Sequence, residues 1–200
     1  IKKIIGKKEA TKNNIAYGNY LLSRYETGNY KKELEYLIKG HKYFFESRKK
    51  KFELGVKYCF EDLIQIARGV TLEKFDDKTD SEIRPIFIVG VPRCGSTLVE
   101  KIIGSGKNYI PMGEETAVLE NFVNSKILEK QSLTLGNANN IRKEINEIYK
   151  LRGLILEKYD YKFTDKSLNN FFYLPLIKQI YPNAKIINCK RHVVESIMSI

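Results

Sequence analysis

The sequence predicts an α/β domain, a P-loop-like parallel sheet flanked by helices, preceded by an α-helical segment. Three observations carry this prediction. Apolar residues recur at helical spacing through much of residues 1–68. From residue 85 onward, short apolar runs alternate with helical patterns, which is typical of a parallel sheet. The first of these runs ends in a glycine-bounded loop that opens a helix, and this is the context of an anion-binding loop.

The helical segment is expected over residues 1–68, with two helical patterns between Ile15 and Phe45 and a further helix from Lys51 to Ala67. Leu34, Leu37 and Ile38 have the spacing of a core-facing stripe. Residues 69–84, rich in Asp and Lys, are predicted to form a linker. Residues 85–200 are expected to be the N-terminal part of the α/β domain.

Within residues 85–200 we expect three strands, each followed by a helix. The strands are predicted from Pro85 to the glycine loop, across Phe163–Asp165, and over Ala184–Cys189. The helices are predicted at Leu98–Ile103, Thr116–Leu128, Asn139–Lys158 and Asn169–Ile180, and again from Val193.

Composition indicates a globular chain with a preference for anions. The 200 residues are 42% hydrophobic, and 35 Lys and Arg against 24 Asp and Glu give a formal charge of +11. No apolar stretch approaches the roughly 20 residues that span a bilayer, so we expect no membrane association. Three widely spaced cysteines fit reduced thiols and a cytoplasmic location, although a targeting segment ahead of Ile1 stays open.

The loop after the first strand has the composition of an oxyanion cradle. Gly90 and Gly95 bound it. Ser96 and Thr97 follow Gly95 directly, whereas a nucleotide triphosphatase would have a lysine between this glycine and the hydroxyl residue. The cation is Arg93, inside the loop, whose guanidinium forks two donors onto a phosphate or sulfate. The alternative is an ordinary strand-to-helix turn.

A second basic segment follows the third strand. This strand ends in Lys190 and Arg191, whereas the corresponding strand of a magnesium-dependent enzyme commonly ends in an aspartate. Ser199 lies about two helical turns after Arg191, so the two side chains could grip a second phosphate. The alternative is that these are solvated loop charges and a surface serine.

Four stretches, in this order, resemble the sulfotransferases that use 3′-phosphoadenosine 5′-phosphosulfate (PAPS), in particular the tetratricopeptide-linked and protein-tyrosine branches. They are Ile88–Leu98, Gly113–Thr116, Phe163–Lys166 with 171–180, and Pro182–Ile187 leading to Arg191 and Ser199. The chain departs from the family pattern at Cys94, Ser96 and His192, and it lacks the His-Pro that usually follows the first helix. Family members also continue well beyond the position of Ile200, so we expect an incomplete catalytic domain.

The resemblance implies a role for each candidate residue. Glu115, or else Glu114, would accept the proton of the acceptor, and Lys166 would stabilise the leaving oxygen. Arg191 and Ser199 would hold the 3′-phosphate. The 5′-phosphosulfate would be held by Arg93, Cys94, Gly95, Ser96, Thr97 and Leu98, with Arg93 also acting in catalysis. The alternative for the two glutamates is that they are acids favoured by the dipole of the following helix.

The predicted activity is sulfuryl transfer from PAPS, with PAP as product, to a hydroxyl or amine. The sequence leaves the acceptor open among a small molecule, a glycan and a protein, with protein tyrosine as one candidate. The alternatives are a P-loop nucleotide kinase and a non-catalytic binding module of the tetratricopeptide type. The module is suggested by Gly28–Tyr30 with Leu37 and Gly40, which resemble one repeat and could bind a protein partner.

Two further classes are disfavoured. His41 and His192 have no metal-ligand neighbours in the sequence, so no metal site is predicted. The basic run Arg48–Lys51 lies among aromatic residues, but its helical spacing indicates a buried aromatic face and a solvated lysine face rather than nucleic-acid binding.

Overall fold

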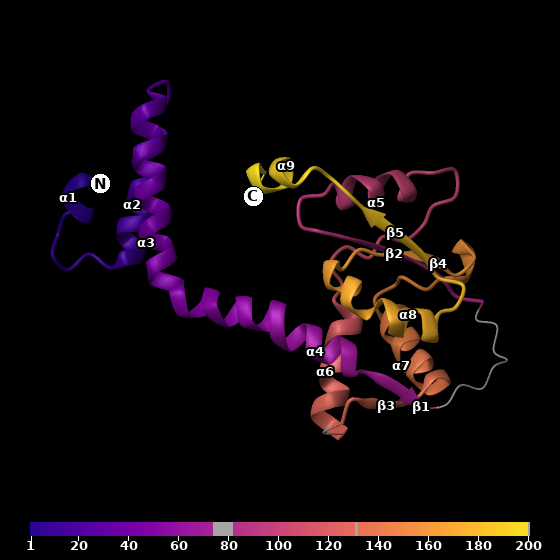
Figure 1. Cartoon of the computed structure of the whole chain (residues 1–200). Coiled ribbons are helices and arrows are strands. Elements are labelled where there is room, and N and C mark those ends of the chain that lie inside the picture. The colour runs from indigo at the N-terminus through magenta and orange to yellow at the C-terminus, as the bar shows by residue number, and fades with distance from the viewer. Residues whose placement is uncertain (74–81, 131, 200) are drawn as a thin grey trace. The chain divides into compact units, whose positions relative to one another are not determined.

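A computed structural model describes residues 1–73, 82–130 and 132–199 (Figure 1). The chain divides into two compact units, Ile1–Leu63 and Ile64–Ile200. The boundary therefore lies five residues before the end of the predicted helical segment. Part of the predicted linker, residues 74–81, lies outside the described residues.

The first unit is a helical hairpin. It contains α1 (Lys2–Ile5), α2 (Lys12–Tyr25), α3 (Tyr30–Lys57) and a π-helical turn, η1 (Tyr58–Asp62). The Thr11 and Asn29 side chains cap α2 and α3 by accepting from backbone N–H groups three residues on. The two helices cross closely at Gly40, where a Cβ atom would lie 2.6 Å from the Tyr20 ring. A glycine is therefore needed at this crossing.

Two expectations for this unit are corrected. Helix α3 runs unbroken to Lys57, through the predicted break after Phe45, because no glycine or proline interrupts residues 41–54. Leu34 and Ile38 do not face a core: they are 57% and 59% exposed. A pair of helices can bury only one stripe on each helix, and here that stripe includes Ala16 and Leu22.

The second unit alternates strands and helices. Its elements are α4 (Leu63–Gly69), β1 (Thr71–Glu73), β2 (Arg84–Gly90), α5 (Ser96–Gly104), α6 (Val118–Lys130), β3 (Thr134–Asn137), α7 (Ala138–Leu151), η2 (Glu157–Tyr159), β4 (Lys162–Asp165), η3 (Leu168–Tyr173), α8 (Leu174–Ile180), β5 (Lys185–Cys189) and α9 (Val193–Met198).

A three-stranded parallel sheet organises this unit, in the order β4-β2-β5. Strand β2 is central because its side chains are apolar on both faces. Ile88 packs with Val99 and Ile103 of α5 on one face. Phe87, on the other face, lies against Tyr181, which follows α8. The carboxyl ends of the three strands meet at one edge, where Gly90 pairs with Cys189. The predicted α/β architecture with a parallel sheet and flanking helices is thus confirmed.

Some elements differ from the sequence expectation. Strand β1 lies within the predicted linker and pairs in parallel with the short strand β3, which was not predicted. Helix α7 ends at Leu151, well before Lys158, and Gly153 follows with a φ of 69°, which stops a helix. The predicted helix over 169–180 begins as the 3₁₀ turn η3.

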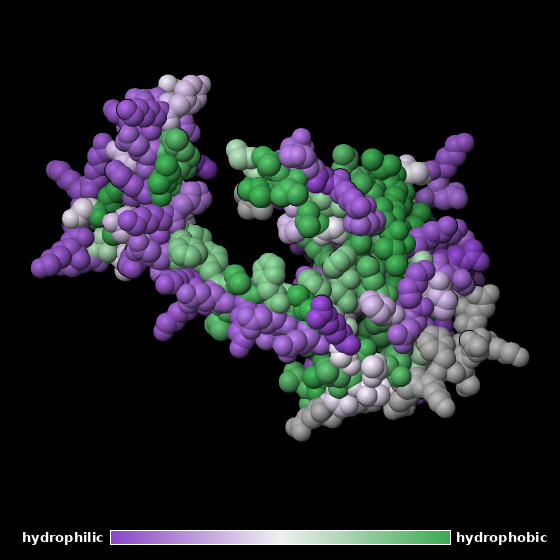
Figure 2. All heavy atoms as spheres, viewed as in Figure 1, coloured by the Kyte–Doolittle hydropathy of each residue, from purple (hydrophilic) through white to green (hydrophobic). Residues whose placement is uncertain are grey.

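Two surface features of the described residues are plain. None of their helices is long and apolar enough to cross a membrane. Helix α9 exposes Val193, Val194, Ile197 and Met198, each at least 58% accessible, and Figure 2 shows the apolar cluster that they form. In the same view the surface of α3 is mostly hydrophilic with small apolar patches.

Candidate active site

The glycine-bounded loop joins β2 to α5 at the carboxyl edge of the sheet. Gly90 is required there because a Cβ atom would lie 2.6 Å from the Cys189 carbonyl oxygen and 2.8 Å from Cys94 Sγ. Gly95 caps α5 with a left-handed φ of 95°. The helix leaves the N–H groups of Gly95, Ser96 and Thr97 without a hydrogen-bond partner among the described residues. These donors lie at the positive end of α5, an arrangement suited to an anion, and are called the anion cradle below.

Two arginines meet beside this cradle. Arg93, in the left-handed region with a φ of 68°, donates from Nε to Ser199 Oγ over 3.2 Å. Arg191 donates from Nη1 to the backbone carbonyl of Arg93 over 3.3 Å, and from Nε to Glu195 over 3.1 Å. The segment after β5 is therefore hydrogen-bonded directly to the glycine-bounded loop.

Lys166 lies one residue beyond β4 and is almost completely buried. Its Nζ lies 2.9 Å from Glu114 Oε1, 3.1 Å from Thr97 Oγ1 and 3.8 Å from Glu115 Oε1. Thr97 Oγ1 in turn donates to Glu114 over 3.1 Å. These bonds join the start of α5 to Gly113–Thr116, called the glutamate segment below, through one buried cation.

The electrostatics of this cluster follow from its contacts. The hydrogen bond from Lys166, the positive charge of Lys166 and the Thr97 hydroxyl together lower the pKa of Glu114. Glu114 is thus held as a carboxylate and is a weak proton acceptor.

The glutamate segment runs alongside β4 as an irregular extra strand. Thr164 N–H donates to the Pro111 carbonyl over 2.9 Å, and Lys166 N–H donates to the Gly113 carbonyl over 3.0 Å. Gly113 permits this approach, because a Cβ atom there would lie 2.4 Å from the Thr164 carbonyl oxygen. Glu115 follows in the left-handed region with a φ of 49°. The backbone of β4 therefore sets the positions of both glutamates.

A buried aspartate, Asp165, anchors the glutamate segment through hydrogen bonds. Asp165 accepts from the Tyr149 hydroxyl over 2.5 Å and from the Thr116 hydroxyl over 2.8 Å. Ser167 donates to the same carboxylate from its N–H and its hydroxyl. Burial, followed by the charge of Asp165, raises the pKa of Tyr149 well above its ordinary value, so the phenol stays a donor. Asp165 thus fixes both the end of β4 and the residue after Glu115.

Glu100 is a second buried acid near the cluster. Its side chain, on α5, accepts from the Thr164 hydroxyl over 2.5 Å, and the same hydroxyl accepts from the Gly113 N–H over 3.2 Å. Burial raises the pKa of Glu100, although the Thr164 hydrogen bond and the charge of Lys166 oppose this. Glu100 links α5, β4 and the glutamate segment.

These elements enclose a recess of about 320 Å³. Three cations and one carboxylate line it. The lining residues are Pro92, Arg93, Gly95, Ser96, Thr97, Glu115, Lys166, Leu168, Arg191 and Ser199. Ligands of open α/β folds bind at this edge of the sheet, outside the carboxyl ends of the strands.

Comparison with known proteins agrees with this site. A model of the sulfotransferase family matches residues 85–200, which is more than half of the chain. The chain belongs to the sulfotransferase family.

A protein of Aquifex aeolicus (strain VF5), described as uncharacterized, is 27% identical over 180 residues. The match covers 86% of this sulfotransferase-family chain and 24% of the relative, so the chain spans about a quarter of the relative's length. No solved structure matches the chain significantly.

The fold brings most of the sequence-predicted residues of this sulfotransferase-family chain together. Eight of them line the recess. Glu114 does not line it but is hydrogen-bonded to Lys166, which does. Two do not face it. Cys94 is buried and packs with Cys189 beneath the loop, and Leu98 is 65% exposed with its N–H bonded to the Gly95 carbonyl.

Sequence reasoning missed the groups that position the site. Asp165, Tyr149, Glu100 and Thr164 are fully or almost fully buried and hydrogen-bonded to one another or to the glutamate segment. The signal available for Glu100 was an acid among the apolar residues of the predicted helix Leu98–Ile103, in which Lys101 is the other charged residue. Leu168 also lines the recess and was not predicted.

The recess is open at its surface and lined by positive charge. Its N–H groups have no protein partner among the described residues, and a Cβ atom at Gly95 would meet nothing within 4 Å, so the loop surface is open. Arg93, Lys166 and Arg191 supply positive charge on the same side. A tetrahedral oxyanion is the ligand for which this set of donors is suited.

Proposed function

We propose that this chain binds PAPS and transfers its sulfuryl group to an acceptor hydroxyl. The observation that carries the proposal is the convergence of Arg93, Lys166, Glu115 and Arg191 on one recess at the carboxyl edge of a parallel sheet. When bound, PAPS supplies an activated sulfuryl group with a good leaving group. The residues of the chain bind, orient and neutralise, as expected for transfer of a charged group.

In this proposal the loop and the two arginines hold the anionic donor. The N–H groups of Gly95, Ser96 and Thr97 and the guanidinium of Arg93 face the 5′ end. Arg191 and Ser199 take the 3′-phosphate, since they line the same recess on the β5 side. Their bonds to Arg93 couple the two ends of the donor site.

Lys166 is proposed to stabilise the negative charge of the leaving oxygen. Its ammonium is almost fully buried, and its Nζ is held by Thr97 and Glu114, so its position is fixed before any ligand arrives. A preorganised cation of this kind costs no rearrangement during the reaction.

Glu115 is proposed as the proton acceptor, in preference to Glu114. Glu115 lines the recess, and its side chain is 72% exposed, so an acceptor hydroxyl can approach it. Glu114 is bonded to Lys166 and Thr97, and its pKa is lowered, which makes it the poorer base. Glu114 would then orient Lys166.

Isothermal titration calorimetry with PAP tests the donor site. Arg93→Ala and Arg191→Ala should each weaken PAP binding by at least tenfold, since each removes a charge-assisted contact worth about 1.5–3 kcal/mol. Lys190→Ala is the matched control: Lys190 is exposed beside Arg191 but does not line the recess, and PAP affinity should be unchanged. Circular dichroism confirms that each variant is folded.

The same titration separates the competing functions. A divergent P-loop kinase would bind ATP with magnesium more tightly than PAP, which would contradict the proposal. A non-catalytic module would bind neither nucleotide. Formation of PAP from PAPS in the presence of phenolic, alcoholic and amine acceptors then identifies the acceptor class.

A further inference from the structure

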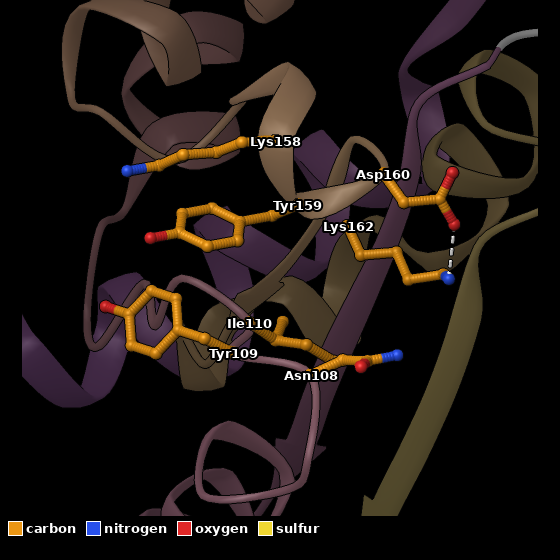
Figure 3. A pocket seen from close by; sticks show the side chains of 7 residues that line it. All are labelled: Asn108, Tyr109, Ile110, Lys158, Tyr159, Asp160 and Lys162. Atoms are coloured by element: carbon orange, nitrogen blue, oxygen red, sulfur yellow. Dashed lines mark hydrogen bonds and ion pairs between the residues drawn. The ribbon is translucent and has the colours of Figure 1, made fainter.

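A second recess lies at the opposite edge of the sheet, where the strands begin (Figure 3). It encloses about 470 Å³ and is lined by residues 108–110, residues 158–160 and Lys162. Lys162 is the first residue of β4, whereas the anion cradle follows the last residue of β2. The second recess shares no residue with the candidate active site.

Two tyrosines form an aromatic corner in this recess. The ring centroids of Tyr109 and Tyr159 lie 4.8 Å apart with an angle of 55° between the planes. Lys158 Nζ lies 4.7 Å from the Tyr159 ring centroid. Figure 3 shows both hydroxyls and this ammonium pointing to the same side. The corner offers apolar ring surface beside a positive charge.

The other end of the recess is polar. Lys162 Nζ lies 2.5 Å from Asp160 Oδ2, and the amide of Asn108 projects toward the same end (Figure 3). The three side chains present both donors and acceptors within a small area. Neighbouring hydroxyl groups, each a donor and an acceptor, are suited to such a surface.

The backbone beside this recess is strained at two residues. Asp160 and Tyr161, neither of them glycine, have φ values of 55° and 52°. Each left-handed residue of this kind costs about 1 kcal/mol or more, and such residues cluster at ligand-binding segments. Here they turn the chain from η2 into β4 and place Tyr159 against Tyr109.

The surroundings of the recess are basic. Arg84, Lys162 and Lys185 are the first residues of the three strands of the sheet, with Arg84 paired to Lys162 in register. Lys107 precedes the aromatic corner and is exposed. The field at this edge therefore attracts an anion.

We propose that this recess binds an anionic pyranose, a six-membered sugar ring carrying a carboxylate or sulfate group. The apolar face of the ring would lie in the Tyr109–Tyr159 corner, with the acid group on Lys158. Its hydroxyls would meet Asn108 and the Asp160–Lys162 pair. A nucleobase inserted between the tyrosines is disfavoured, because rings 4.8 Å apart leave no slot between them. The inference is independent of sulfuryl transfer.

Nitrogen-15 NMR titrations of the full chain test this assignment, with glucose 6-sulfate, glucose and hexauridylate as probes. Glucose 6-sulfate should shift the amide signals of residues 107–110 and 158–162. Glucose should shift the same signals with an affinity up to about fivefold weaker, which is what loss of one exposed ion pair of up to 1 kcal/mol would give.

Single substitutions separate the contribution of the two tyrosine rings to sugar binding from that of the Lys158 ammonium. Tyr159→Ala and Tyr109→Ala should each weaken glucose 6-sulfate binding by at least about tenfold, as expected for loss of an aromatic contact surface. Tyr109 is 52% exposed, so its replacement keeps the test valid even if Tyr159→Ala does not fold. Lys158→Gln should bring glucose 6-sulfate to the affinity of glucose. Tyr25→Ala, an exposed tyrosine of α2, is the matched control and should have no effect.

The outcomes are distinct. Tighter binding of hexauridylate than of glucose 6-sulfate at these signals would reassign the recess to nucleic acid and overturn the proposal. Shifts confined to other residues, or an affinity that the tyrosine variants leave unchanged, would overturn it as well. PAP is proposed to bind at the other edge of the sheet. A chain that does not bind PAP but still shows the sugar-induced shifts would therefore contradict the proposed function alone.

Discussion

The Arg191 guanidinium donates to the backbone carbonyl of Arg93, and this bond joins segments almost a hundred residues apart. Since Nε of Arg191 is bonded to Glu195 at the same time, the planar fork spans two partners. Arg93 is held in turn by Ser199. The two arginines therefore act as one basic cluster, although the sequence assigned them to two different phosphates.

Arg191→Lys should separate charge from geometry in this cluster. A lysine keeps the positive charge but cannot bond Glu195 and the Arg93 carbonyl together, so we expect PAP affinity to fall about tenfold, or about 1.4 kcal/mol. Calorimetry at two salt concentrations checks this. An affinity equal to that of the native chain would show that only the charge matters.

Replacing the two glutamates separately tests the assignment of the base. Glu115→Gln should lower kcat by roughly 10²–10⁴-fold, the usual contribution of a general base, while PAP affinity stays within about twofold. Glu114→Gln should lower kcat less, because it alters the partner of Lys166 rather than the proton acceptor. Initial rates of PAP formation, with an acceptor that the native chain uses, give the comparison. The reverse order of effects would move the role to Glu114.

Glu100→Gln should change how stability depends on pH. The pKa of Glu100 is raised in the folded chain, so the native state binds its proton more tightly than the unfolded state does. The contribution of Glu100 to stability is therefore full below its ordinary pKa of 4.5 and is lost as pH rises through the raised pKa. The glutamine variant keeps an acceptor for Thr164 and loses this dependence.

Urea unfolding at pH 4.5, 6 and 7.5 measures the effect. The stability of Glu100→Gln relative to the native chain should rise from pH 4.5 upward and level off once the pH exceeds the raised pKa of Glu100. A difference that stays constant with pH would mean that Glu100 has the same pKa in both states. The lowered pKa of Glu114 acts in the opposite sense and below 4.5, where its contribution is lost as pH falls.

The sequence revealed the parts of the site that are local, and the structure supplied the parts that depend on long-range packing. Gly90, Arg93 and Gly95 lie in one continuous strand, loop and helix, so their spacing alone indicated a cradle. Lys166 and Arg191 were placed because each follows a predicted strand, and parallel strands end at one edge. The attachment of the glutamate segment to β4 has no local signature.

The same reasoning explains the missed strands. Strands β1 and β3 have three and four residues and lie about sixty residues apart, so neither has a periodic pattern long enough to predict. The buried partners Tyr149 and Asp165 were hidden for a related reason: the tyrosine lies on α7 and the aspartate at the end of β4. Only the packed fold brings them together.

Gly113→Ala should uncouple the glutamate segment from the donor site. The new Cβ atom would lie 2.4 Å from the Thr164 carbonyl oxygen and 3.1 Å from Leu154 Cδ1, so the segment or β4 must move. We expect a loss of about 1–3 kcal/mol in unfolding free energy, as for other overpacked sites. Since both glutamates follow Gly113, turnover should fall by more than tenfold, whereas PAP binding at Arg93 and Arg191 should change little.

Gly106→Ala is the matched control for this substitution. A Cβ atom at Gly106 would make only an ordinary contact of 3.6 Å with the Ile103 carbonyl oxygen, so stability should stay within about 0.5 kcal/mol. Thermal unfolding, PAP calorimetry and turnover are measured for both variants. If Gly113→Ala weakened PAP binding as much as turnover, the glutamate segment would belong to the donor site itself. If both were unchanged, the close approach to β4 would have no part in placing Glu115.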